Sequence, residues 1–120
     1  MKTPSDIRLS KDKKKLTITF DEVEYSMSSE FLRVHSPSAE VQGHGKGQEV
    51  LQLNKQNVEI AKLQPTGNYA IAIHYSDSHS TGIYSWNYLH HLAINYDQLW
   101  LDYSQKVNDT KKNNYHKVVI

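Results

Sequence analysis

Two stretches of the sequence alternate between apolar and polar or small side chains, a pattern typical of strands that bury one face. They are LTITF at residues 16–20 and YAIAIHY at residues 69–75. The small residues on the second face of YAIAIHY predict that another part of the chain packs closely there. Asp21-Glu22 and PTGN at 65–68 predict short turns. Because short turns join antiparallel strands, whereas parallel strands need long crossovers, we expect mainly antiparallel pairing.

Helical patterns occupy other parts of the chain. Ser28 or Ser29 is placed to cap a short helix through SSEFLRV, and Ser85 to cap another that begins at Trp86. Asn95 and Gln98 fit a capping box for a third helix. The apolar stripe of that third helix contains Tyr96, Leu99, Trp100, Tyr103 and Val107.

These elements predict an α+β fold, a small two-layer domain with a mainly antiparallel sheet packed with C-terminal helices. A chain of 120 residues fits one domain, which we place at residues 1–110. Residues 111–120 are expected to form a tail, either loose or docked as an end strand. SPSAEVQGHGKGQ at 36–48, with three glycines within five residues, predicts a surface loop.

Composition excludes several classes of function. The formal charge of +1 gives no field to attract nucleic acid or an anionic membrane, so neither is expected as a partner. The absence of cysteine excludes disulfides, thiolate metal sites and cysteine nucleophiles. No apolar run resembles a signal peptide or approaches the roughly 20 residues that span a bilayer. We therefore expect a cytoplasmic protein.

HYSDSHS at 74–80 is the segment whose side chains are most suited to metal binding or catalysis. A two-residue turn at Asp77-Ser78 would set residue 75 opposite 80 and place His74 and His79 on one face, at diagonal positions. Two imidazoles there could share a metal if a third ligand joined them. The alternative is that both are ordinary polar strand residues, and for a pair of histidines beside a turn this is the more frequent case.

Other motifs give weaker support for a catalytic or binding site. Asp77 and His79 match only part of the two-histidine, one-carboxylate iron triad. His90 and His91 point about 100° apart on a helix and cannot face each other. GHGKG at 43–47 lacks the spacing of a phosphate-binding loop. No G-x-S-x-G elbow is present.

Three segments together resemble a family: LRVHSPSAEVQGHGKGQ at 32–48, PTGNYAIAIHYSDSHSTGIYSWNYLHHL at 65–92, and the following NYDQLWLDY. The chain resembles the gamma-butyrobetaine hydroxylase-like N-terminal domain, in a stand-alone bacterial form long described as a domain of unknown function. The resemblance implies that, in carnitine-biosynthesis hydroxylases, such a domain precedes an iron- and 2-oxoglutarate-dependent catalytic domain. It holds structural zinc through three cysteines and a histidine.

On this sequence the three cysteine positions implied by the resemblance are Ser36, Ser38 and Val41, and the histidine position is His79. Neutral hydroxyls and a methyl group cannot replace thiolates as zinc ligands. The resemblance therefore implies a zinc-binding fold without its cysteines, and its catalytic oxygenase half is absent from these 120 residues. Similar domains are also fused to P-loop ATPases that carry iron–sulfur clusters.

Three hypotheses follow. The first, which we favour, is a non-catalytic accessory or protein-interaction domain with an unknown protein partner and no cofactor. Tyr84, Trp86 and Tyr88 would contribute to its surface. The second is a protein that binds a divalent metal, zinc or iron. Its candidate ligands are His79, His44, Glu40 and His74.

The third hypothesis, an independent enzyme, has the least support, because no nucleophile, acid–base pair or cofactor cradle stands out. The sequence does not name a partner, a pathway or an oligomeric state.

Overall fold

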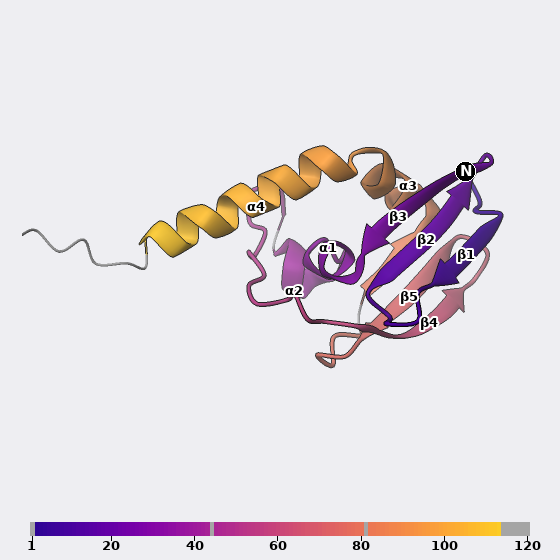
Figure 1. Ribbon diagram of the computed structural model, residues 1–120, viewed down its shortest axis with the longest axis horizontal. Coiled ribbons are helices and arrows are strands. Elements are labelled where there is room, and N and C mark those ends of the chain that lie inside the picture. Colours follow the sequence, from indigo (N-terminus) through magenta and orange to yellow (C-terminus); the bar gives the residue numbers. More distant parts are fainter. Residues whose placement is uncertain (1, 44, 81, 114–120) are drawn as a thin grey trace, which may run out of the picture.

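The computed structural model describes residues 2–43, 45–80 and 82–113, and within them it forms an α+β domain in which a group of strands followed by helices occurs twice along the chain (Figure 1). Six strands and four helices lie in the described part, in the chain order β1 (Asp6–Leu9), β2 (Lys15–Phe20), β3 (Val23–Ser28), α1 (Ser29–Val34), α2 (Ala39–Gln42), β4 (Ile60–Thr66), β5 (Ala70–Tyr75), β6 (Gly82–Ser85), α3 (Trp86–Ile94) and α4 (Tyr96–Asn113). The predicted α+β class is confirmed.

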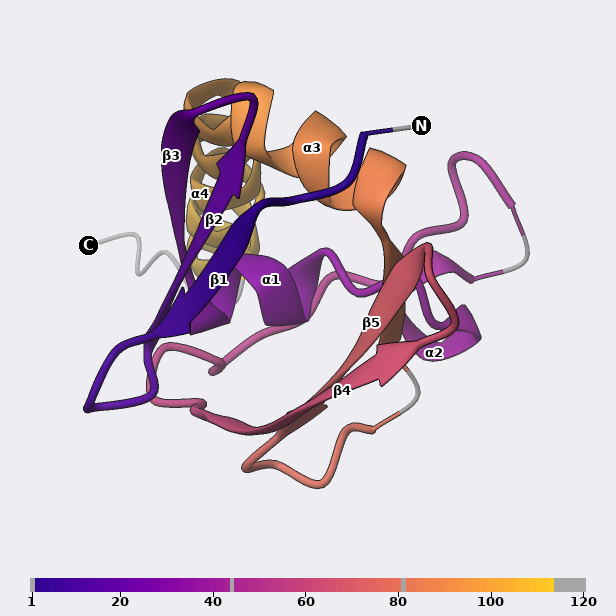
Figure 2. The same ribbon diagram turned by 90° about the vertical axis from the view of Figure 1, so that its right-hand side faces the viewer.

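The strands form two three-stranded antiparallel sheets, in the orders β1-β2-β3 and β4-β5-β6. Figure 2 shows the two sheets splayed apart with α1 between them. One backbone and one side-chain hydrogen bond join them near the start of α1: Ile60 N–H donates to Lys13 O at 2.8 Å, and Ser29 Oγ donates to Val58 O at 2.6 Å. The predicted antiparallel pairing is thus correct, but it is divided between two sheets.

Turn chemistry explains the first sheet. Asp21 and Glu22 both have positive φ, 48° and 68°, as a two-residue turn between twisted strands requires. The turn pairs Phe20 with Val23 and sets the register of β2 against β3. β1 was not predicted, because an edge strand of four residues with only two half-buried apolar side chains carries little periodic signal.

Two helix caps agree with the sequence and one does not. The Ser28 hydroxyl accepts from Phe31 N–H at 3.0 Å, and the Ser85 hydroxyl accepts from Tyr88 N–H at 3.1 Å. The capping box at Asn95 and Gln98 is absent.

Asn95 instead ends α3, donating its side-chain amide to His91 O at 2.9 Å, while Gln98 donates to Asp102 at 2.9 Å. With one residue between α3 and α4, Asn95 already serves as the end of the earlier helix.

The core fills the space between the sheets and the helices. Both faces that alternation predicted to be apolar contribute to it, from β2 and β5, together with α1, β6 and α3. The fully buried members include Leu16, Ile18, Phe31, Leu32, Ile60, Ile73, Tyr84 and Leu89. On the other face of β5, Ala70 and Ala72 are buried as well, as their small size predicted.

Helix α4 projects from the body of the domain (Figure 1). With α4 included, the structure measures 60 × 31 × 26 Å along its principal axes. It continues to Asn113, so the tail predicted from residue 111 begins inside the helix, and residues 114–120 lie outside the described part. Among the helices of the described residues, none has the length and apolar character to cross a bilayer.

The phenol of Tyr84 provides a test of how the core is held. Tyr84 is fully buried, donates to Leu32 O at 2.5 Å and accepts from the Tyr75 hydroxyl at 2.7 Å. Tyr84→Phe leaves both partners unpaired, and we expect it to lower the free energy of unfolding by about 1–3 kcal/mol in urea titrations. Tyr69→Phe, at a 54 % exposed site, is the control and is expected to change little. Equal losses in the two variants would contradict this role.

Candidate functional site

His79 lies at the centre of a buried polar cluster. The β5–β6 ladder has the predicted register, with Ile73 opposite Gly82. The connection is wider than two residues, however, because Tyr75 N–H donates to His79 O at 2.9 Å and Ser78 has a positive φ of 69°. The loop turns the imidazole inward, 5.9 Å from the Tyr75 ring between centroids, and only 1 % of the side chain is exposed.

Both ring nitrogens of His79 meet residues from the α1–α2 segment. Nε2 lies 2.8 Å from Ser36 Oγ and 3.3 Å from Ser38 Oγ. Nδ1 lies 3.2 Å from Glu40 Oε2. A carboxylate only accepts hydrogen bonds, so Nδ1 carries the proton, and Nε2 accepts from the Ser36 hydroxyl. The imidazole therefore joins the β5–β6 loop to the segment that contains Ser36, Ser38 and Glu40.

A second set of contacts surrounds the imidazole. Arg33, only 2 % exposed, donates from Nε to Asp77 Oδ2 at 2.9 Å, and its Nη2 lies 3.5 Å from Glu40 Oε1. Lys55 donates to the same Asp77 oxygen at 2.7 Å, and Asp77 Oδ1 accepts from His79 N–H at 3.3 Å. A buried guanidinium is strongly unfavourable without paired anions, so Asp77 is required for Arg33 to be inside.

These surroundings shift two pKa values. Burial, and then the nearby Arg33 guanidinium, lower the pKa of His79, and together they outweigh the opposing effect of Glu40. For Asp77, partial burial acts upward, but hydrogen bonds from Lys55 and Arg33 hold its pKa below the ordinary value. The site thus favours a neutral histidine beside an ionised aspartate.

The order Ser36, His79, Glu40 is that of a hydrolytic triad: serine oxygen to one ring nitrogen, carboxylate to the other. The environment of Ser36 does not suit a nucleophile. Ser36 is 0 % exposed, and its hydroxyl oxygen also accepts from Ser38 N–H at 3.3 Å and lies 3.2 Å from Ser38 Oγ. This set of bonds ties the loop to the sheet and leaves no route for a substrate to the hydroxyl.

The structure brings two of the four predicted metal ligands together. Glu40 contacts His79, whereas His74 does not. The expected shared face is wrong, because His74 alternates with the core-facing Tyr75 and its Nε2 is buried without a hydrogen-bond partner in the described residues. His44 lies outside the described residues. In the part of the chain that is described, no three His, Cys, Asp or Glu residues are placed to hold a metal ion.

The predicted surface aromatics are mostly inside. Tyr84 is fully buried and Trp86 is 7 % exposed, with its indole N–H donating to Asn68 O at 2.9 Å. Tyr88 is half-buried and donates to His35 O at 2.6 Å. Tyr84 and Trp86 therefore serve the core and cannot form a contact surface in this structure. Their alternation in a short strand leading into a capped helix already favoured burial.

Sequence reasoning missed Arg33 and Gly82. A β-carbon on Gly82 would lie 2.8 Å from Ser36 Oγ and 2.9 Å from Tyr84 Cε1, so only glycine lets Ser36 approach the sheet. Arg33 is separated from Asp77 by 44 residues. The only signal in the sequence was a basic residue between the apolar Leu32 and Val34 of a short helix.

A family model described as gamma-butyrobetaine hydroxylase-like, N-terminal, matches residues 7–90. The chain belongs to this family. A comparison with curated proteins found no match. In the family's terms, Ser36, Ser38 and His79, which the resemblance assigned to ligand positions, are the residues that meet in the polar cluster. Val41 occupies the remaining ligand position. It is buried on α2, close to Ser38 in the sequence.

Solved structures agree with this assignment. One protein with an NMR solution structure is 43 % identical, with a TM-score of 0.81, over 100 % of this chain and 97 % of that one. Another, also solved by NMR, is 40 % identical, with a TM-score of 0.77, over 92 % and 83 % of the two chains. A crystal structure at 1.93 Å of a protein of unknown function from Acidithiobacillus ferrooxidans, of the DUF971 family, is 29 % identical, with a TM-score of 0.63, over 76 % and 92 %.

The depressed pKa of His79 makes stability depend on pH. In the unfolded chain His79 takes up a proton near pH 6.5, whereas in the folded chain it does so only at lower pH. The contribution of His79 to the free energy of unfolding is therefore complete above about pH 6.5 and is lost as pH falls through its folded pKa. We expect the free energy of unfolding to decline from pH 7 to pH 5, and His79→Gln to make this decline shallower.

His91→Gln, at an exposed helix position, is the control and should retain the full slope. The burial-lowered pKa of His35 contributes in the same direction, so a part of the slope remains in His79→Gln. An unchanged slope in His79→Gln would remove His79 from this account.

The serine positions can be tested by restoring thiolates. We expect the triple variant Ser36→Cys, Ser38→Cys, Val41→Cys to retain one zinc ion per chain, because three thiolates would join the imidazole of His79. Adding His79→Ala to the triple variant should weaken binding strongly. The measurement is elemental analysis of protein purified without a histidine tag. One equivalent of zinc or iron in the natural chain, lost on His79→Ala, would contradict the account.

Proposed function

We propose that this chain is a non-catalytic accessory domain that acts by binding another protein. The polar cluster supports this proposal, since both ring nitrogens of His79 have hydrogen-bond partners within the domain and its serine is enclosed. Binding of zinc or iron through His79 and Glu40 is the alternative function, and the metal analysis described above decides between them.

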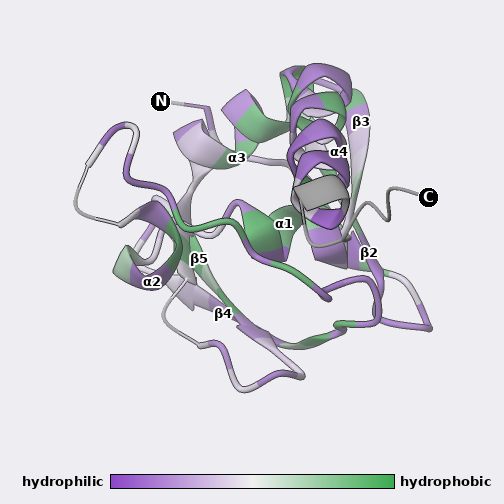
Figure 3. Cartoon of the chain, turned by 90° about the vertical axis from the view of Figure 1, so that its left-hand side faces the viewer, coloured by the Kyte–Doolittle hydropathy of each residue, from purple (hydrophilic) through white to green (hydrophobic). Residues whose placement is uncertain are grey.

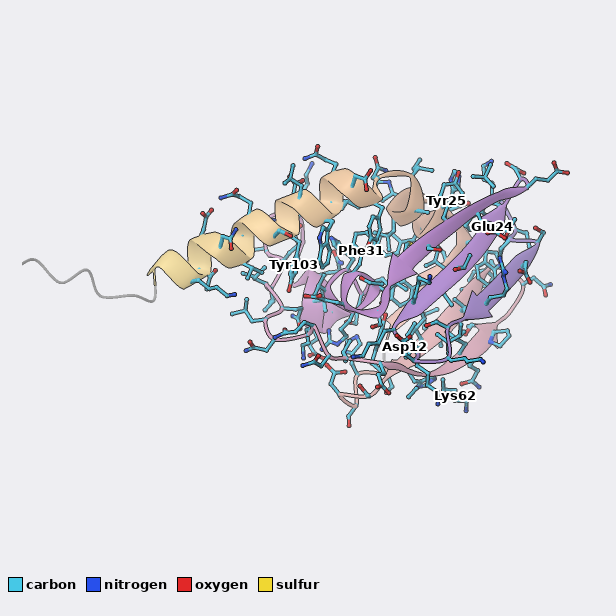
Figure 4. All side chains as sticks on the ribbon, viewed as in Figure 1. Asp12, Glu24, Tyr25, Phe31, Lys62 and Tyr103 are labelled. Atoms are coloured by element: carbon cyan, nitrogen blue, oxygen red, sulfur yellow. The ribbon has the colours of Figure 1, made fainter. Side chains whose placement is uncertain are left out.

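The observation that carries the proposal is the surface around α4. We define the α4 face as α4 together with the segment of residues 50–56 that passes beneath it. Tyr103 fastens the two by donating to Gln52 O at 2.8 Å, and Phe31 and Tyr103 lie between α1 and α4 (Figure 4). On either side of Tyr103 there is an open pocket, with volumes of about 440 and 690 Å³.

Large apolar side chains are exposed on this face. Val50, which is 52 % exposed, lines the larger pocket, and Leu53, which is 38 % exposed, lines the smaller one. Figure 3, viewed from the end towards which α4 projects, shows hydrophobic positions along the segment that follows α2 and passes α1. Exposed apolar groups beside open pockets are typical of protein contact sites. The larger pocket is walled in part by Val41 and Gln42, so a partner there would touch the segment that holds His79.

Site-specific photo-crosslinking in cells tests the proposal. A photoreactive phenylalanine at Val50 is expected to give one adduct of discrete mass, identified by mass spectrometry, because this side chain lines the larger pocket of the contact face. The matched control is the same residue at Ile83, which is 51 % exposed on β6 and is expected to give none.

A charge on the face provides the complementary variant. Val50→Glu should abolish the adduct formed from a crosslinker at Lys106, which lines the same pocket, whereas Ile83→Glu should not. Both sites are exposed, so the fold tolerates either change. No adduct at Val50, or equal adducts at Val50 and Ile83, would contradict the proposal.

A further inference from the structure

The smaller pocket of the α4 face lies between α4 and the first turn of α1. Its volume is about 440 Å³. Trp100 and Tyr103 form its wall on α4, Glu30 enters from α1, and residues 53–56 contribute Leu53, Asn54 and Gln56. Asn108 completes the rim one turn beyond Ser104. The pocket thus combines two aromatic rings, one carboxylate and several amides.

The carboxylate of Glu30 has no cation of its own. It is half-buried and forms no ion pair with any residue in the described ranges, although Lys111 lies on the same rim. Burial alone raises the pKa of Glu30, which means that its negative charge is poorly solvated. Burial, and then the Glu30 charge, also raise the pKa of the neighbouring Tyr103 to about 12. A cation in this pocket would compensate a charge that the described residues leave unpaired.

The aromatic wall is held in place before anything binds. The rings of Trp100 and Tyr96 are nearly parallel, with centroids 6.4 Å apart and an interplanar angle of 5°. Tyr103 lies 5.6 Å from Trp100 between centroids and is fixed through its bond to Gln52. Aromatic faces attract cations, tryptophan most strongly. A pocket built in this way favours a flat cation that can stack on the ring.

Arginine fits these features better than lysine. Its guanidinium is planar, weakly hydrated and able to stack on an indole, and two parallel N–H groups can reach one carboxylate. The amide oxygens of Asn54 and Asn108 are available to accept from the remaining N–H groups. A compact ammonium would keep more of its hydration and match the ring plane less well.

We propose that the pocket formed by Glu30, Trp100 and Tyr103 receives an arginine side chain of the partner protein. The inference rests on the proposed interaction role, and it names the chemistry by which that partner is recognised. Glu30 pairs with the guanidinium, Trp100 stacks on it, and the exposed apolar groups of the α4 face surround the contact.

The test is an NMR titration of the full ¹⁵N-labelled chain with the blocked tripeptide acetyl-Gly-Arg-Gly-amide. The chain has two tryptophans, so the indole N–H of Trp100 reports on the pocket and that of Trp86, bonded to Asn68 O, is the internal reference. We expect a saturable shift of the Trp100 signal in the millimolar range and none at Trp86. The citrulline analogue, which has the same shape without the charge, should give no saturable shift.

Two matched variants locate the charge. Glu30→Gln should weaken binding of the arginine peptide at least roughly tenfold, as expected when a charge-assisted hydrogen bond is lost. Glu24→Gln, on exposed β3 where the carboxylate pairs with Arg8, should leave binding unchanged. Trp100→Leu, read from the backbone amide signals of Tyr103 and Ser104, should weaken binding without affecting the Trp86 signal.

Each outcome decides the inference. Equal binding by Glu30→Gln and Glu24→Gln, equal binding of the lysine and arginine tripeptides, or no saturable shift with arginine would overturn it. If the crosslink at Val50 forms while the arginine peptide fails to bind, the interaction role stands and the pocket assignment falls. If the peptide binds and no crosslink forms, the pocket recognises arginine but the proposed interaction role fails.

Discussion

The imidazole of His79 is the contact on which the rest of the structure depends. One ring nitrogen of His79 meets the serine hydroxyls of the α1–α2 segment, and the other meets Glu40. The backbone N–H of His79 donates to Asp77, which in turn pairs with buried Arg33. Through these bonds one small group of side chains connects the end of α1, the start of α2 and the β5–β6 loop. The glycine-rich loop and the segment beneath α4 continue from this junction, so it also positions the α4 face.

The chemistry of this junction differs from that implied by the family resemblance. Zinc bound by thiolates joins segments through strong bonds between a cation and anionic sulfur, and it contributes folding free energy directly. In this chain neutral hydroxyls and a neutral imidazole occupy those positions, and each hydrogen bond contributes only about 1 kcal/mol. The core formed by two sheets and α1 must therefore provide most of the stability. The lowered pKa of His79 is the consequence, because a protonated ring would be poorly solvated beside Arg33.

Much of the fold was predictable because the signals are local. Alternation identified β2 and β5, and the hydroxyls of Ser28 and Ser85 identified the starts of α1 and α3. β1 escaped prediction because four residues at a sheet edge carry almost no periodicity. The capping box failed because Asn95 satisfies the end of the preceding helix, a choice between neighbours that residue types alone do not settle.

The site was predictable only in part. The resemblance identified His79 with Ser36 and Ser38, and the structure brings them within hydrogen-bond distance. Arg33 and Gly82 could not be found, since their roles depend on contacts across 44 and 46 residues of sequence. The shared face of His74 and His79 was wrong because register alone does not say to which side of the sheet the loop residue His79 turns. The α4 face was missed because its exposed residues have meaning only once Tyr103 holds α4 over residues 50–56.

The most direct measurement of the central claim is the tautomeric state of His79, read from the ¹⁵N chemical shifts of its ring nitrogens at pH 7. The account predicts a neutral ring that carries its proton on Nδ1, directed at Glu40, while Nε2 accepts from Ser36. A proton on Nε2, or shifts that show a ring nitrogen bound to a metal ion, would contradict it.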